Sequence, residues 1–131
     1  FQECNKLSNI SIPEGVTSIG PYTFENCTGL TSITLPNSVT EIKSGVFSGC
    51  SKLTSITIPK DVTSIGSEVF KDCKTLRKIV CEKATPPTGG VYMFDNNASE
   101  RKIYVPRNSV GTYKSASFWK EYADDIVGYD F

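Results

Sequence analysis

Cysteines are the first residues of this sequence to consider for chemistry, because the chain of 131 residues contains no histidine. Without histidine it can form neither a Ser-His-Asp or Cys-His catalytic group nor a histidine-ligated zinc site. Four of the 5 cysteines recur every 23 residues, as Cys4, Cys27, Cys50 and Cys73. This spacing matches no zinc signature, and the chain has no C-x-x-C pair. The cysteines are therefore expected either to form disulfide bonds or to pack as reduced side chains in the core.

Carboxylates are the other candidates for chemistry, as general acids or bases. Each lies in a polar or helix-terminal stretch, where a solvated carboxylate is the ordinary state, and no pattern pairs two of them across a cleft. The candidates are Glu82, Asp95, Glu100, Asp124 and Asp125. Serine and threonine are abundant, but they lack an activating histidine or lysine motif, and no phosphate-binding glycine loop occurs. The sequence therefore predicts a protein that is not an enzyme and uses no cofactor or metal.

The charge balance narrows the choice of partner. The chain has 14 basic and 14 acidic residues, so it lacks the basic excess that nucleic acids and anionic membranes attract. No stretch approaches the roughly 20 apolar residues of a membrane span. We expect no nucleic-acid partner and no membrane span in this chain. The oligomeric state is left open.

The elements that must position these residues follow from the same 23-residue interval. One pattern, L-x-x-I-x-I-P-x-x-V-T-x-I-x-x-x-x-F-x-x-C-x-x, accounts for residues 1 to about 81. One such unit buries too little apolar surface to fold alone, so successive units must stack as a solenoid in which equivalent residues form columns. Phe1 already holds a mid-repeat position. We therefore expect a truncated N-terminal end and a chain that is the C-terminal part of a longer array.

Each unit has three segments. Leu53-Thr-Ser-Ile56-Thr-Ile58 alternates apolar and hydroxyl residues near its end, which is typical of a strand with one buried face, and Pro59 ends it. Val62-Thr-Ser-Ile65 is β-prone but short, and it predicts a second extended segment. In residues 44–50, phenylalanine and cysteine are three positions apart, which predicts about one helical or 3-10 turn.

Stacking of the units also determines the distance between equivalent cysteines. Equivalent Cα atoms in neighbouring units would lie about 4.8 Å apart, within the disulfide range. In-register strands, however, keep the Cβ atoms about equally far apart, beyond the roughly 3.8 Å that a disulfide prefers. We therefore predict a column of small buried hydrophobic side chains that close the turn before each strand. Cys81 takes an inward strand position and is predicted to lie in the core as well.

The unit resembles the BspA-like leucine-rich repeats, also called the Treponema pallidum type, of bacterial surface proteins. The resemblance rests on the 23-residue period, the proline after the strand and the F-x-x-C before the next leucine. It implies an α/β repeat solenoid, a right-handed superhelix of mostly short parallel strands with one helical or 3-10 turn per repeat. It also implies an extracellular or cell-surface location and a non-enzymatic role in protein–protein binding or adhesion.

The last third of the chain departs from the pattern. Residues 103–106 restore the strand and its proline after a Thr-Pro-Pro break, which gives a fifth, degenerate rung. Beyond it, the spacing of apolar residues from Trp119 to Ile126 predicts a helix, and a structural role for the tryptophan is favoured over ligand stacking. Candidate helix N-caps are Asn108 or Ser109, and Ser117. We therefore divide one structural domain into a solenoid of about five rungs, residues 1–106, and a helical capping segment, residues 107–131.

Outward positions of the predicted sheet change character along the array. In the first three rungs they are small hydroxyl residues such as Thr31, Ser55 and Thr57. Toward the C-terminal rungs the face acquires residue types that anchor protein interfaces, namely Arg77, Lys78, Val80, Lys102 and Tyr104. Two interpretations stay open for this face, an ordinary solvated sheet surface and a binding site for a protein.

Two functional hypotheses follow. The first is a bacterial cell-surface or secreted binding module, whose partner the resemblance places among host matrix proteins and other bacterial surface proteins. The second is a structural spacer or assembly segment with no ligand of its own, which projects another domain or associates through its N-terminal rung. The sequence does not identify the partner.

Overall fold

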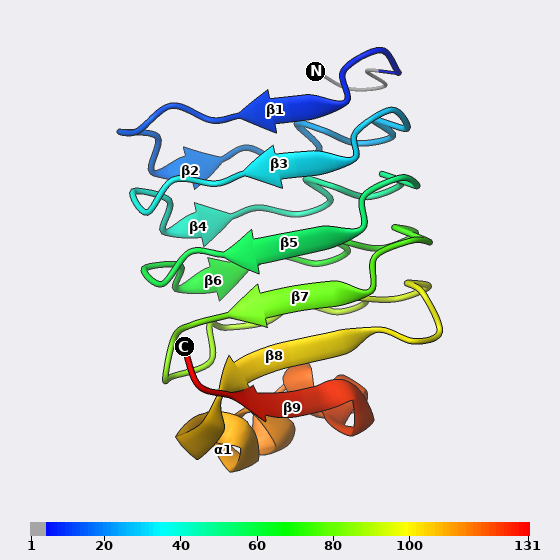
Figure 1. Cartoon of the computed structure of the whole chain (residues 1–131). Coiled ribbons are helices and arrows are strands. Elements are labelled where there is room, and N and C mark those ends of the chain that lie inside the picture. The colour runs from blue at the N-terminus through cyan, green and yellow to red at the C-terminus, as the bar shows by residue number, and fades with distance from the viewer. Residues whose placement is uncertain (1–4) are drawn as a thin grey trace.

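The computed structural model describes residues 5–131, and it shows a solenoid whose chain coils through successive rungs (Figure 1). One face carries one longer strand per rung, and the opposite face carries the two-residue strands. The first set is β1 (Asn9–Ser11), β3 (Ser32–Thr34), β5 (Ser55–Ile58), β7 (Lys78–Cys81), β8 (Lys102–Pro106) and β9 (Ile126–Tyr129). The second set is β2 (Ser18–Ile19), β4 (Glu41–Ile42) and β6 (Ser64–Ile65).

All strand pairs are parallel, and their register repeats the period of the sequence. Ser55 of β5 pairs with Lys78 of β7, 23 residues later, and Lys78 pairs with Lys102 of β8. The hydrogen-bonded sheets are β1-β3 and β5-β7-β8-β9 on one face and β2-β4-β6 on the other. The predicted solenoid of short parallel strands is therefore confirmed, and so is the short second extended segment of each unit.

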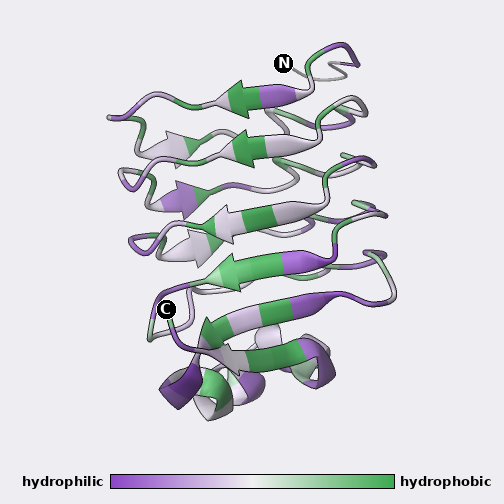
Figure 2. Ribbon diagram, in the orientation of Figure 1, coloured by the Kyte–Doolittle hydropathy of each residue, from purple (hydrophilic) through white to green (hydrophobic). Residues whose placement is uncertain are grey.

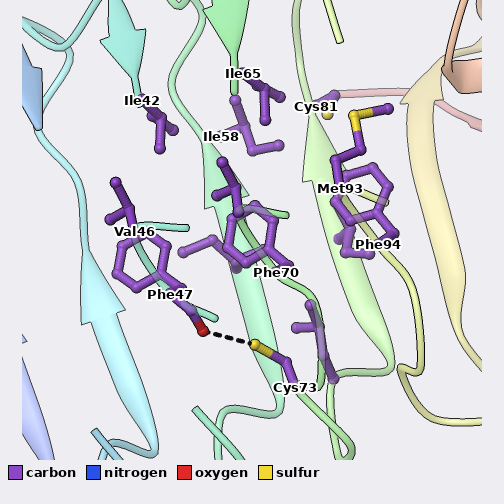
Figure 3. Packing of buried hydrophobic residues seen from close by; sticks show 14 of the residues in the cluster. Ile42, Val46, Phe47, Ile58, Ile65, Phe70, Cys73, Cys81, Met93 and Phe94 are labelled. Atoms are coloured by element: carbon purple, nitrogen blue, oxygen red, sulfur yellow. Dashed lines mark hydrogen bonds between the residues drawn. The ribbon is translucent and has the colours of Figure 1, made fainter. Parts of the chain in front are cut away.

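The core lies between the two faces and is built from columns of equivalent side chains (Figure 3). Along β5 the alternation buries Ile56 and Ile58 and leaves Ser55 and Thr57 exposed, and Figure 2 shows the resulting apolar bands along the strands. The largest column is a parallel stack of rings with centroids 5.4 to 5.6 Å apart, made by Phe24, Phe47, Phe70 and Phe94. One residue type repeated at one position thus builds a continuous core from units too small to fold alone.

The segment from Ser44 to Cys50 differs from the predicted helical or 3-10 turn, since it consists of consecutive tight turns. The N–H groups of Gly45 and Phe47 donate to carbonyls of the next rung, at 2.9 Å each, whereas the N–H of Ser48 donates within the segment. Positive φ angles of 66° at Gly45 and 78° at Gly49 permit this path. A helix would keep its N–H groups within the segment, so the bonds between rungs explain why turns form instead.

The C-terminal segment, residues 107–131, contains short helices but ends in a strand that the sequence analysis did not predict. The 3-10 helix η1 (Arg107–Ser109) is followed by α1 (Val110–Ser115) and the 3-10 helix η2 (Trp119–Asp125). Ile126 then begins β9 instead of continuing a helical stripe, and it pairs with Ile103 of β8. Pairing with the exposed edge of β8 satisfies backbone groups that a helix at this place would leave open.

The predicted helix N-caps are also wrong in detail. Ser109 does precede α1, but its side chain makes no capping hydrogen bond, and Asn108 lies inside η1. The residue before η2 is Phe118, not Ser117, and it has a positive φ of 69°. Packing of the adjacent aromatic side chain of Trp119 against Phe94 therefore outweighs local capping at this helix start.

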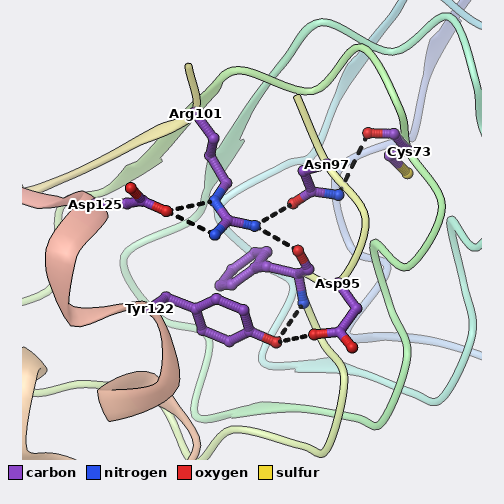
Figure 4. A network of polar contacts seen from close by, with 7 residues as sticks. Cys73, Asp95, Asn97, Arg101, Tyr122 and Asp125 are labelled. Atoms are coloured by element: carbon purple, nitrogen blue, oxygen red, sulfur yellow. Dashed lines mark hydrogen bonds and ion pairs between the residues drawn. The ribbon is translucent and has the colours of Figure 1, made fainter. Parts of the chain in front are cut away.

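A network of polar contacts joins the C-terminal segment to the backbone around Phe94, the last phenylalanine of the ring stack (Figure 4). The Phe94 N–H donates to the Tyr122 hydroxyl at 3.2 Å, and this hydroxyl donates to the Asp95 carboxylate at 2.9 Å. Burial raises the pKa of Tyr122 to about 12, so the hydroxyl keeps its proton at neutral pH. Arg101 donates to the Phe94 carbonyl and forms an ion pair with Asp125 at 2.6 Å.

Across residues 5–131, no helix is long and apolar enough to cross a membrane. The expectations for Phe1 and Cys4, that they begin the aromatic and cysteine columns, lie outside the described residues.

Candidate binding surface

The cysteines serve packing, as the sequence predicted. The described thiols of Cys27, Cys50, Cys73 and Cys81 are all buried, and those of Cys50, Cys73 and Cys81 are free. The Cys73 thiol donates to the Phe47 carbonyl at 3.1 Å, and the Cys50 thiol makes the equivalent bond one rung earlier at 3.2 Å. Burial raises the pKa of Cys50 to about 12, and it raises the pKa of Cys73 as well. These thiols therefore stay protonated at neutral pH and are poor nucleophiles.

Three of the five candidate carboxylates have structural partners or line a surface groove, whereas Glu100 and Asp124 are exposed. Asp125 is ion-paired with Arg101, and Asp95 accepts a hydrogen bond from Tyr122. Glu82 lies on the sheet face that carries the predicted binding residues. Among residues 5–131, no group of 3 or more histidine, cysteine, aspartate or glutamate side chains is placed to hold a metal ion. The surface most suited to function is therefore the sheet face itself.

Strand register gathers most of the predicted binding residues on β7 and β8. Lys78 pairs with Lys102, and Val80 pairs with Tyr104, so these outward side chains form two adjacent columns. The Lys78 ammonium lies 5.9 Å from the centre of the Tyr104 ring, a distance at which a cation and an aromatic face attract each other. Arg77 precedes β7 and is exposed, and neither Arg77 nor Lys102 lines the groove on this face.

Tyr129 at the end of β9 and Phe131 just beyond it add two aromatic rings to this face, and neither was predicted from the sequence. The Tyr129 ring meets Tyr104 edge-on with centroids 5.8 Å apart, and Phe131 contacts Tyr129 at 5.2 Å. Both added side chains are more than half exposed, at 52% and 54%. With the strand residues they form the sheet-face groove, a cavity of about 260 Å³ lined by Lys78, Val80, Glu82, Tyr104, Tyr129 and Phe131.

The missed residues had a weak signal in the sequence. Ile126-Val-Gly-Tyr129 is β-prone, but the i, i+3, i+4, i+7 spacing that leads up to it favours a helix. Next to the end of this strand, Arg107 and Asp130 form an exposed ion pair at 2.8 Å. Hydrogen bonding to Arg107 lowers the pKa of Asp130, as expected for a carboxylate beside a guanidinium.

Comparison with known proteins bears on this architecture. The sequence matches the BspA type leucine-rich repeat region over residues 1–123, in 6 copies. The chain belongs to the BspA-type leucine-rich repeat family. The family assignment agrees with the stacked rungs and with the recurring phenylalanine and cysteine columns. No protein of curated function matches the sequence significantly.

Solved structures of bacterial leucine-rich and leucine-rich repeat proteins are similar to this chain. A leucine-rich cell surface protein from Faecalibacterium prausnitzii matches with a TM-score of 0.70 and 28% identity, over 100% of this chain and 32% of its own. A leucine-rich repeat protein from Eubacterium ventriosum matches with a TM-score of 0.61 and 30% identity, over 77% of this chain and 26% of its own. This BspA-type chain thus spans about a third or less of these relatives.

Proposed function

We propose that this chain is a protein-binding module of a bacterial cell-surface or secreted protein, and that it binds through the sheet-face groove without catalysis. The observation that carries the proposal is the change of the outward face between neighbouring rungs. Ser55 and Thr57 on β5 are replaced in register by Lys78 and Val80 on β7, while the buried residues of the two strands stay apolar. A change confined to the outer surface does not serve the core, which supports a role in recognition.

The side chains of the groove favour a protein partner. Exposed tyrosine and phenylalanine offer large contact areas at low cost in conformational entropy, and they are frequent anchors of interfaces. Lys78 and Lys102 lie side by side on this face, and Arg77 adjoins them, against the single carboxylate of Glu82 in the groove. The partner is therefore expected to present a carboxylate next to an apolar side chain.

The location and the class of partner rest on the relatives. One solved relative is described as a cell surface protein, and surface exposure would place the groove in contact with other cells and with host tissue. The partner we propose is a host matrix protein or a surface protein of another bacterium, bound in adhesion.

A rung-matched variant tests the proposal. Lys78→Ser and Val80→Thr introduce the residue types found at the same positions of β5, and Tyr104→Thr extends the hydroxyl surface to β8. Binding of the natural chain to purified host matrix proteins and bacterial surface proteins would be measured by biolayer interferometry. We expect the triple variant to lose at least about tenfold in affinity for any protein that the natural chain binds, because anchor residues dominate interface energies.

The matched control is Thr34→Ala, which changes an outward position of β3 on the same face and should leave the affinity unchanged. Equal melting temperatures of all three proteins would show that the variants fold. An unchanged affinity of the triple variant would reject the sheet-face groove. Failure of the natural chain to bind any protein of the panel would favour the spacer hypothesis.

A further inference from the structure

A second groove lies where the last rung meets the C-terminal segment, and it shares no residue with the sheet-face groove. Its volume is about 410 Å³. The residues that line this end groove are Gly90, Val91, Tyr92, Asp95, Phe118, Glu121 and Tyr122. In a regular array this space would be filled by the turn segment of one more rung, because each turn segment stacks on the next.

The end groove contains a backbone donor that the regular rungs do not leave open. The N–H groups of Gly45 and Glu68 each donate to a carbonyl of the following rung at 2.9 Å. Tyr92 holds the equivalent position of the last rung, and its N–H has no acceptor among residues 5–131. Two residues later the Phe94 N–H is satisfied by the Tyr122 hydroxyl, so the C-terminal segment completes one position and leaves the other free.

The walls of the end groove are aromatic and exposed. Tyr92 is 57% exposed and Phe118 is 39% exposed. Phe118 also has a φ of 69°, a backbone conformation that is costly for a bulky side chain. Because the Phe118 side chain is partly exposed, its packing contacts offset little of the energy that this backbone conformation costs. An aromatic ring held in the open beside a groove is instead suited to contact a ligand.

The charge of the end groove is negative. It contains the carboxylates of Asp95 and Glu121, and its lining includes no basic residue. Lys71, whose ammonium lies 5.8 Å from the Tyr92 ring, is already ion-paired with Glu68 at 3.2 Å. Aromatic faces beside carboxylates form an environment that attracts an ammonium or guanidinium group.

We propose that the end groove binds a peptide segment of a partner protein through a lysine or arginine side chain. The cation lies against the Tyr92 and Phe118 rings and near the carboxylates of Asp95 and Glu121. A backbone carbonyl of the same segment accepts the hydrogen bond that the Tyr92 N–H offers. The peptide thus supplies the acceptor that a further rung would have supplied, and a cation for the carboxylate of Glu121, which forms no ion pair within residues 5–131.

Titration of the 131-residue protein with N-acetyl-arginine methylamide, followed by ¹H–¹⁵N NMR, tests the proposal. We expect binding in about the millimolar range, with the largest amide shifts at Tyr92, Phe118 and Glu121. The uncharged N-acetyl-norleucine methylamide, which has a comparable chain length, should give much smaller shifts. Because an exposed charge pair is screened by salt, raising the ionic strength should weaken the arginine titration.

Variants locate the site. Glu121→Gln removes one carboxylate and should weaken binding about twofold to fivefold. Tyr92 has a φ of 59°, which asparagine tolerates, so Tyr92→Asn removes the ring and should weaken binding by a similar factor. Glu82→Gln, which removes the carboxylate of the sheet-face groove, should change nothing. Equal shifts with both amides, or shifts centred on Lys78 and Tyr104, would overturn the proposal. Self-association seen in sedimentation and abolished by Glu121→Gln would also overturn it, because a second copy would then fill the groove.

Discussion

The regular rungs and the C-terminal end solve the same problem with different groups. Inside the array, the Cys73 thiol donates to the Phe47 carbonyl of an earlier rung. One rung later, Asn97 replaces the cysteine, and its amide donates to the Phe70 carbonyl at 2.8 Å. At the end of the array, the guanidinium of Arg101 donates to the Phe94 carbonyl. A thiol, an amide and a guanidinium thus fill one structural role in succession.

Groups of the C-terminal segment also replace those of a further rung in the backbone hydrogen bonds and in the ring stack. The Phe47 N–H donates to the Val69 carbonyl of the next rung, whereas the Phe94 N–H donates to the Tyr122 hydroxyl. The ring stack ends against Trp119, tilted by 60° with its centroid 5.6 Å from that of Phe94. We therefore interpret the C-terminal segment as a cap, which supplies the bonds and contacts of a further rung without repeating its sequence.

The comparison also shows where the molecule leaves contacts open. Regular rungs bond to neighbours on both sides, so their turn segments offer few free groups. At the end, the Tyr92 N–H stays open, and the outer face of β8 and β9 carries exposed rings. The end groove lies in this part of the chain, which has departed from the repeat, and the sheet-face groove lies between this part and β7.

The largest expected effect comes from breaking the ring stack in a regular rung. Phe47 is fully buried between Phe24 and Phe70, so Phe47→Ala leaves a cavity that rigid neighbours on both sides cannot close. We expect the free energy of unfolding to fall by about 3 to 5 kcal/mol, measured by denaturant titration. A loss below about 1 kcal/mol would contradict the stacked column. Thr57→Ala, on the outward face, serves as the control.

The next effect concerns the join between the last rung and the cap. Arg101→Met removes the ion pair with Asp125 and the donor to the Phe94 carbonyl, at a largely buried site. We expect a loss of about 1.5 to 3 kcal/mol in the free energy of unfolding. Arg107→Met breaks the exposed ion pair with Asp130 and should cause no measurable loss. Equal losses in the two variants would show that Arg101 does not join the cap to the rung.

The smallest expected effect is a difference between two reciprocal substitutions. Cys73→Asn places an amide in a fully buried site, and Arg77, which holds the position of Arg101 in this rung, is exposed to solvent, so we expect a cost of about 1 to 3 kcal/mol. Asn97→Cys keeps a donor for the Phe70 carbonyl and loses the contact with Arg101 and a long 3.3 Å bond to the Cys73 carbonyl, so its cost should be about 1 kcal/mol or less. Chemical denaturation of both variants gives the comparison. A larger cost for Asn97→Cys would reject the equivalence of the two positions.

The sequence predicted the parts of the fold that are repeated. Period, strand position and the buried columns follow from side chains that recur every 23 residues, and a column needs no knowledge of distant contacts. The turn segment was misjudged, because its bonds to the neighbouring rungs leave no local pattern. β9 was missed because the spacing around Trp119 and Tyr122 is helical, while pairing with β8 decides the conformation of Ile126.

The candidate site was predicted in part for the same reason. Lys78, Val80 and Tyr104 stand in outward positions of repeated strands, so their neighbourhood could be derived from the register. Tyr129 and Phe131 reach the groove only through β9, and Tyr92 faces the end groove only because no further rung follows it in this structure.

Amide hydrogen exchange at two positions of the last rung tests the central claim, that the cap takes over the contacts of a further rung at one position and leaves the adjacent one open. We predict that the Phe94 amide is protected to a similar degree as the Phe70 amide, because the Tyr122 hydroxyl accepts its hydrogen bond. The Tyr92 amide should exchange close to the rate of an unprotected amide, whereas the equivalent Glu68 amide exchanges slowly. Protection of Tyr92 equal to that of Glu68, or an unprotected Phe94, would contradict the account.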